Sequence, residues 1–164
     1  MTLNIDNAIK LIGHSSDQPD LDTLLDDAGI VQRPHYDGHD VTATQIEADN
    51  GAVVLQFTAV YQDSYGLPRS EGPLILEDVT IQNRRFEEGI GPFTGTLPLG
   101  LRLDMTQPEI IERLGEPTSS MEFLGGFFLT YDGLFPELTV NIRLDLATRI
   151  MHFVRFMPVE LQEA

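Results

Sequence analysis

The 164-residue sequence contains no cysteine, a single lysine (Lys10) and no long apolar run. The lack of cysteine excludes disulfides, thiol catalysis and zinc sites built on cysteine. The apolar stretch from Phe123 to Tyr131 is about half of the ~20 residues that a membrane-spanning helix needs. The first six residues show neither the basic nor the apolar segment of a secretory signal. We therefore expect a cytoplasmic protein that does not bind membranes.

Basic residues are scarce, so the chain is strongly acidic. Its 26 Asp and Glu residues outnumber ten Lys and Arg residues, which gives a formal net charge of −16. Residues 1–82 hold 14 acids and three bases (net −11), and residues 83–164 hold 12 acids and seven bases (net −5). A direct nucleic-acid binder needs a basic surface, so we expect no such partner. The charge favours a basic protein partner, with solubility as the alternative explanation.

Apolar spacing predicts two short helices in the first thirty residues. Two apolar stripes repeat at helical spacing, and Gly13 and Gly29 stand where the helices should end. Alternating β-branched residues then predict strands, and Asn50-Gly51 predicts a hairpin turn with positive φ. The expected strands are 41–48, 52–61 and 74–82, and the expected loops are 33–40 and 62–73.

The order of elements repeats after a Gly- and Pro-rich segment at 89–100, which we interpret as a linker. Thr106 and Glu109 have the spacing of a capping box at the start of a helix, and Gly115 stands at its end. The strands expected after this helix are 123–131, 138–145 and 149–156.

These elements predict an α+β fold of two tandem helix-plus-antiparallel-sheet repeats, each with three to four strands. The helix regions align weakly at an offset of 102 residues, which places Gly13 on Gly115. Each half is too small to bury a helix and a sheet face alone, so we expect a shared core. The expected boundaries are 1–88 for the first repeat, 89–100 for the linker and 101–164 for the second repeat, with one compact domain as the alternative.

The stretch from Gly100 to Pro117 contains a Met-Thr pair and ends in Leu-Gly-x-Pro. It resembles the helix motif of the SmpA/OmlA and β-lactamase-inhibitory-protein group, and the run that follows resembles that group's meander of strands. The resemblance implies a sheet with helices on one face and the other face free to bind protein. That group includes tandem-repeat inhibitors, outer-membrane assembly lipoproteins and immunity-like proteins of bacterial toxin systems. Because this chain lacks the cysteines of the secreted members, we expect a cytoplasmic partner.

Catalytic and metal sites have little support in the sequence. The segment from His35 to Asp40 holds two histidines and two aspartates that could ligate zinc, but Pro34 and Gly38 favour an exposed polar loop. Acidic pairs such as Glu77-Asp78 would point to opposite faces of a strand, which does not suit a hydrolase. We therefore expect no catalytic residue, no metal and no cofactor.

We interpret the chain as a non-catalytic protein-binding module, an immunity or inhibitor protein that occludes a basic partner such as a toxin domain. Carboxylates would pair with the partner's Arg and Lys, and tyrosines beside them would act as anchors. The expected partner-binding residues are Asp22, Asp26, Asp27, Glu47, Asp49, Tyr61, Asp63, Tyr65, Tyr131 and Asp132.

Two alternatives remain open. One is a structural or adaptor subunit of a bacterial assembly or secretion system, which an exposed apolar face would favour. The other is a small hydrolase, which a polar cleft joining His35 or His39 to two acids would favour. A homodimer through a sheet edge is compatible with each of these functions.

Overall fold

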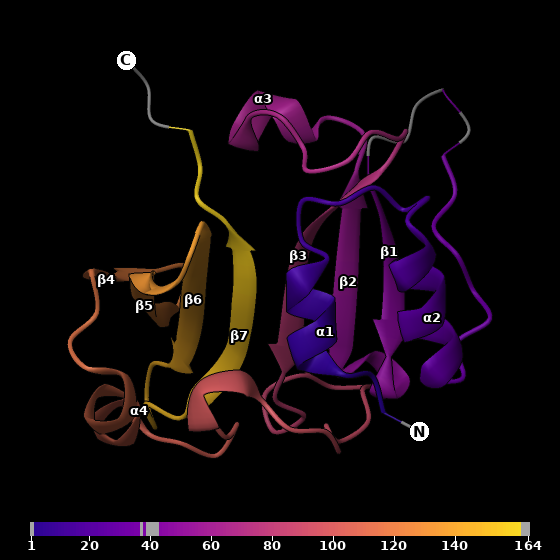
Figure 1. Ribbon diagram of the computed structural model, residues 1–164. Helices are drawn as coiled ribbons and strands as arrows, with labels where there is room; N and C mark the ends of the chain where they lie inside the picture. Colours follow the sequence, from indigo (N-terminus) through magenta and orange to yellow (C-terminus); the bar gives the residue numbers. More distant parts are fainter. Residues whose placement is uncertain (1, 37, 39–42, 162–164) are drawn as a thin grey trace.

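A computed structural model describes residues 2–36, 38 and 43–161 of the chain (Figure 1). Its centre is one antiparallel sheet of seven strands in the order β1-β2-β3-β7-β6-β5-β4. The strands are β1 (Ala43–Ala48), β2 (Val53–Thr58), β3 (Ile75–Gln82), β4 (Ser119–Phe123), β5 (Gly126–Phe135), β6 (Leu138–Asp145) and β7 (Met151–Pro158). The helices are α1 (Ile5–Lys10), α2 (Pro19–Asp27), α3 (Tyr61–Tyr65) and α4 (Gln107–Leu114), with single 3-10 turns at Asp49–Gly51 and Pro98–Gly100. Of the helices in the described ranges, none has the length and apolar character needed to cross a membrane.

Helices α1 and α2 begin and end where local chemistry favours it. The Asn4 side chain accepts a hydrogen bond from the Asn7 N–H at 3.0 Å and caps α1. Pro19 opens α2, at a position where a helix has no amide hydrogen bond to lose. Gly13 and Gly29 follow the helices with φ of 89° and 74°, values that glycine adopts without strain. Both helices expected near the N-terminus are therefore confirmed.

Helix α4 is also capped as expected. The Thr106 N–H donates to Glu109 Oε1 at 3.2 Å, and the Thr106 hydroxyl donates to the same oxygen at 2.9 Å. Gly115 ends the helix with φ of 88°. Its carbonyl accepts a hydrogen bond from the Tyr131 hydroxyl at 2.9 Å, which ties the end of the helix to β5.

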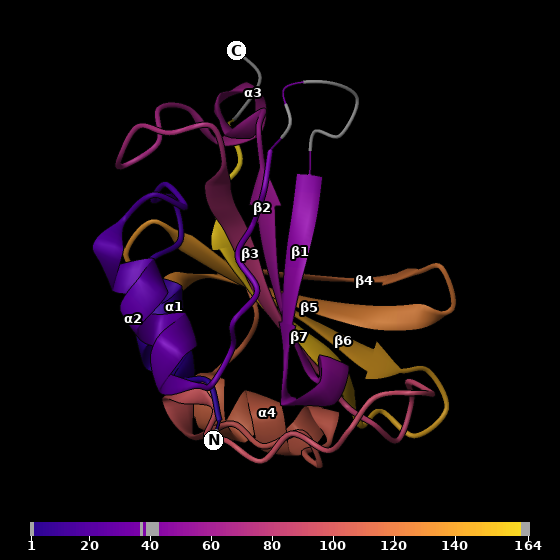
Figure 2. The same cartoon turned by 90° about the vertical axis from the view of Figure 1, so that its right-hand side faces the viewer.

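One face of the sheet is buried, whereas most side chains of the other are half-buried or exposed. Along β6 and β7 burial alternates: Ile142 and Val154 are fully buried, while Arg143 and Arg155 are half-buried. This is the period-two pattern of a sheet with a single covered face. Side chains from α1, α2 and α4 join the buried face in one hydrophobic core. In Figure 2, α1 and α2 lie on one side of the sheet and α4 at its lower end.

The α+β class is confirmed, but the chain does not form two clear helix-plus-sheet repeats. The strands of both halves build one continuous sheet, because β3 pairs with β7. The second half has four strands, since Ser119–Phe123 forms an edge strand that was not expected as a separate element. The segment 62–73, expected as a loop, contains most of α3.

The hairpin between β1 and β2 forms at the predicted place. Asn50 and Gly51 have φ of 53° and 91°, as expected for the turn. Residues 41 and 42, at the start of the first expected strand, lie outside the described residues.

Candidate binding face of the sheet

The face of the sheet opposite α1 and α2 is not covered along its length by a helix of the described chain. Helix α3 lies only at its upper end (Figures 1 and 2). We call this surface the open face. Its side chains come from alternate strand positions, and they include Gln45, Gln56, Asp78, Thr80, Arg155, Phe153, Asn141, Arg143, Thr130 and Phe128. Apart from the buried Thr80, these side chains are half-buried or exposed, so a partner could reach them.

A β-bulge brings two neighbouring carboxylates to the open face. The register pairs Gln56 with Asp78 and Phe57 with Leu76, so Glu77 is an extra residue in β3. Glu77 Oε2 accepts a hydrogen bond from Gln56 Nε2 at 3.2 Å, although Gln56 stands opposite Asp78. The expectation that these adjacent acids point to opposite faces is therefore wrong, because the bulge breaks the alternation.

Tyr65 of α3 lies beside these carboxylates. Its hydroxyl donates to Glu77 Oε1 at 3.4 Å. Burial raises the pKa of the Tyr65 phenol above its usual value, and three nearby carboxylates add to this effect. The ring and these carboxylates form what we call the acidic cluster: Tyr65, Glu77, Asp78 and Glu160. At neutral pH this cluster offers one hydroxyl donor, one aromatic ring and several acceptor oxygens.

Within the acidic cluster, Asp78 is the carboxylate whose ionised form is disfavoured by burial. Burial raises the pKa of its carboxyl from 3.8 to about 6; Arg155 opposes this shift and Glu77 adds to it. Asp78 Oδ1 accepts a hydrogen bond from the Thr80 hydroxyl at 3.2 Å. Thr80 in turn accepts one from Arg155 Nε at 3.1 Å. These contacts offset only part of the lost hydration, so a further cation would stabilise the ionised carboxylate.

A shallow hollow of about 310 Å³ lies next to the acidic cluster. Thr139 and Asn141 line it, with Asp132 and Glu160 as its charged residues. This volume is at the small end of ligand sites and suits one inserted side chain better than a substrate. Among the described residues, no group of three or more His, Asp or Glu side chains is placed to hold a metal ion.

Two of the three expected tyrosine anchors are not available to a partner. Tyr61 and Tyr131 are only 7% and 3% exposed, so the exposure expected of them is wrong. The Tyr61 ring packs against Tyr65 with 4.9 Å between centroids, and the Tyr131 hydroxyl is engaged by Gly115. Large rings with one polar atom are readily buried when that atom finds a partner, as in Tyr131. Of the three, Tyr65 alone reaches the open face.

The expected carboxylates do not form a single patch. Asp22 and Asp26, on the outer side of α2, both bind Arg33, at 2.7 and 2.6 Å. Asp132 is on β5 and Glu47 on β1, with four strands between them. The other expected carboxylates, each at least partly exposed, are Asp27 on α2, Asp49 in the turn after β1 and Asp63 on α3. One partner surface could therefore contact only some of the expected residues at a time.

The expected polar loop is described only in part. Asp37, His39 and Asp40 lie outside the described residues, whereas His35 is exposed. His152, which was expected on the solvent face, lies beside Phe153 of the open face, and its side chain is 14% exposed. Its Nε2 atom lies 2.7 Å from Glu87 Oε1. A register shift between β6 and β7 makes His152 an extra residue of β7, and its ring packs against Phe86.

Sequence reasoning missed the acidic cluster because long-range contacts assemble it. The Leu161 N–H donates to the Ser64 carbonyl at 2.8 Å, which brings the end of the described chain and its Glu160 to α3. One local signal was present, since two adjacent acids inside the strand 74–82 are unusual for a β-strand.

The comparisons with known proteins add little on function. No family model matches the chain, and no match is found among curated proteins. Among solved structures, the chain shows a partial likeness to a DUF4309 family protein (YjgB) from Bacillus subtilis, with 14% sequence identity and a TM-score of 0.47. That alignment covers 93% of this chain and 91% of the other. A likeness at this level says nothing about what this chain binds.

Proposed function

We propose that this chain is a non-catalytic protein-binding module, and that it acts as a cytoplasmic immunity or inhibitor protein that covers a basic partner such as a toxin domain. The acidic cluster on the open face is the observation that carries this proposal. A lysine or arginine of the partner would pair with Asp78 and Glu77 and lie against the Tyr65 ring. The pairing would give Asp78 an ion-pair partner, which it does not have among the described residues, in addition to the nearby charge of Arg155.

The other acidic residues support the proposal at longer range. The −16 net charge produces a field that attracts cationic proteins and can raise association rates by roughly 10- to 1000-fold at low salt. Asp27 and Asp20 on α2 are exposed and contribute to this field without belonging to the open face. Inhibition would follow from occlusion: the open face would cover the functional surface of the partner.

Affinity capture from the source cell tests the proposal. The immobilised chain should retain a basic protein at low salt, and the double variant E77Q/D78N should retain much less of it. The matched control is D20N/D27N, which removes two charges from α2 and leaves the open face intact. Equal losses for both variants would show that net charge, and not the acidic cluster, drives binding. Capture of no basic protein would contradict the proposal.

The immunity form of the proposal has its own test. Deleting the gene should sensitise the source cell to a toxin whose basic domain the chain binds, and the wild-type chain should restore resistance. The E77Q/D78N variant should fail to restore it, while D20N/D27N should succeed. Unchanged sensitivity after deletion would count against an immunity role.

The tandem-repeat interpretation of the fold also remains a proposal. Gly13 and Gly115, which the 102-residue offset aligns, both end helices and have nearly equal φ of 89° and 88°. This likeness supports a common origin of the two helix regions, although their strands merge into one sheet.

A further inference from the structure

The lower half of the open face carries arginine and phenylalanine side chains in alternation. The Arg143 guanidinium lies over the Phe128 ring, 5.8 Å from its centroid, and the Arg155 guanidinium lies over the Phe153 ring at 5.0 Å. The two rings meet edge to face with centroids 6.2 Å apart. We call Arg143, Phe128, Phe153 and Arg155 the arginine–phenylalanine row.

Strand register places the whole row on the open face. Arg143 of β6 stands opposite Phe128 of β5 and Phe153 of β7. The adjacent Ile142 and Val154 are fully buried on the helix side, so the row must point away from the core.

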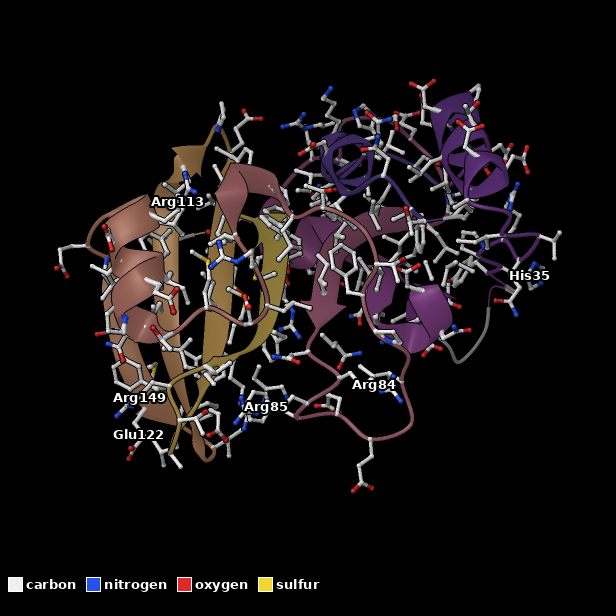
Figure 3. All side chains as sticks on the ribbon, turned by 90° about the horizontal axis from the view of Figure 1, so that it is seen from below. His35, Arg84, Arg85, Arg113, Glu122 and Arg149 are labelled. Carbon is white, nitrogen blue, oxygen red and sulfur yellow. The ribbon has the colours of Figure 1, made fainter. Side chains whose placement is uncertain are left out.

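The row continues below through further stacked groups. His152 lies 5.8 Å from Phe153 and 5.6 Å from Phe86, measured between ring centroids, and Arg85 lies 5.4 Å from the Phe86 centroid. Figure 3 shows Arg84 and Arg85 on the side of the sheet away from α1 and α2. This end of the open face is therefore rich in guanidinium groups.

The arginines of the row make no salt bridge among the described residues, although Arg155 lies near Asp78. The ion pairs there involve Arg33, Arg69, Arg102 and His152. Arg143 Nη2 donates to the Leu124 carbonyl at 3.0 Å, but its buried Nε has no acceptor among the described residues. Six of the nine arginines make no salt bridge among the described residues, and the two arginines of the row are among them. Arg149 Nη1, on the other face, is likewise buried without an acceptor among the described residues, so the case for the row rests on its stacked geometry and its position on the open face.

We propose that the arginine–phenylalanine row binds an acidic segment of a partner protein. Carboxylates of the segment would pair with Arg143 and Arg155, and its apolar side chains would cover Phe128 and Phe153. Arginine forms paired hydrogen bonds with carboxylates, and arginine and aromatic residues dominate the energetics of protein interfaces. On β4, Met121 and Phe123 are 57% and 52% exposed and would extend the apolar contact. This proposal does not rest on the proposed function, because it concerns the opposite charge and other residues.

A nucleic acid fits the row less well, although its phosphates would also pair with arginine. Arg155 lies close enough to Asp78 to lower the pKa of that carboxyl, so the acidic cluster begins beside the row. A long polyanion laid along the open face would meet Asp78 and Glu77, and the net charge of −16 would repel it. A short segment with a few carboxylates can stay within the row.

Peptide titration followed by NMR tests this proposal on the full chain. The probes are a short synthetic peptide of alternating glutamate and valine, the same peptide with lysine for glutamate, and a single-stranded thymidine oligonucleotide of equal length. The glutamate peptide should shift the Nε–Hε signals of Arg143 and Arg155. R143Q and R155Q should each weaken its binding roughly tenfold, the loss expected for one charge-assisted pair.

The matched control is R149Q. Arg149 also lies over a phenylalanine ring, 4.3 Å from the Phe127 centroid. Phe127 stands opposite the buried Leu144, so this pair belongs to the other face of β5, and R149Q should bind the peptide like the wild type. If a variant does not fold, the shifts of the Arg143 and Arg155 signals in the wild-type protein still test the proposal. Tighter binding of the oligonucleotide, no shift of either arginine signal at millimolar peptide, or an equal loss in R149Q would overturn the proposal. Binding of the lysine peptide at the acidic cluster is a separate observation, which bears on the proposed function and not on the row.

Discussion

Replacing Asp78 by asparagine should stabilise the protein, and the gain should grow with pH. The folded pKa of Asp78 is about 6, against 3.8 for an ordinary aspartate. A carboxyl whose pKa is raised on folding is harder to ionise in the folded state, so ionisation lowers the stability. The loss of stability caused by ionisation of Asp78 is absent well below pH 3.8, develops between pH 3.8 and 6, and is complete above pH 6. A shift of about two pKa units corresponds to about 3 kcal/mol.

Asparagine removes the charge and keeps an oxygen that can accept the hydrogen bond from Thr80. Urea unfolding of D78N and the wild type at pH 5 and pH 8 measures the effect, since both values lie above the pI near 4.3. About half of the effect is present at pH 5, so the advantage of D78N should grow by about 1 to 2 kcal/mol between the two pH values.

The control for this experiment is Asp27→Asn on the exposed side of α2. It removes the same charge, and we expect it to change the free energy of unfolding by no more than about 0.5 kcal/mol at either pH. An advantage of D78N that stays constant or shrinks as pH rises would refute the reasoning about desolvation.

Four further substitutions test packing and hydrogen bonding, each by urea unfolding. Phe156→Ala empties a fully buried position of the core and should cost about 3 to 5 kcal/mol, whereas Phe123→Ala on the exposed edge should cost less than about 0.5. Tyr131→Phe removes a hydrogen bond of 2.9 Å and should cost about 1 kcal/mol; no change would mean that this bond is unimportant. Asn83→Ala leaves two carbonyls without their donor, at 2.9 and 3.0 Å, and should cost about 2 kcal/mol.

Local chemistry made the helices and the first hairpin predictable. Thr106 and Glu109 form a capping box that depends only on residues three apart, and Gly115 ends the same helix. The turn at Asn50 and Gly51 requires positive φ, which these residue types accept most easily. Such features need no knowledge of distant contacts.

The unpredicted parts of the fold depend on contacts that are distant in sequence. All five residues of β4 are exposed, so the strand has no alternation that could identify it. The pairing of β3 with β7 joins segments more than seventy residues apart and turns the expected repeats into one sheet. The bulge at Glu77 follows from the register with β2, and it placed both acids of the pair on one face.

The open face carries two groups that folding alone leaves unfavourable. Asp78 is ionised at a cost in stability, and Arg143 Nε is buried without an acceptor in the described chain. Proteins often retain such groups where function requires them, at the expense of stability. Under the proposed function, D78N should be more stable than the wild type yet retain less of its partner. If D78N gains stability but binds the partner as well as the wild type does, the Asp78 carboxylate is not needed for binding.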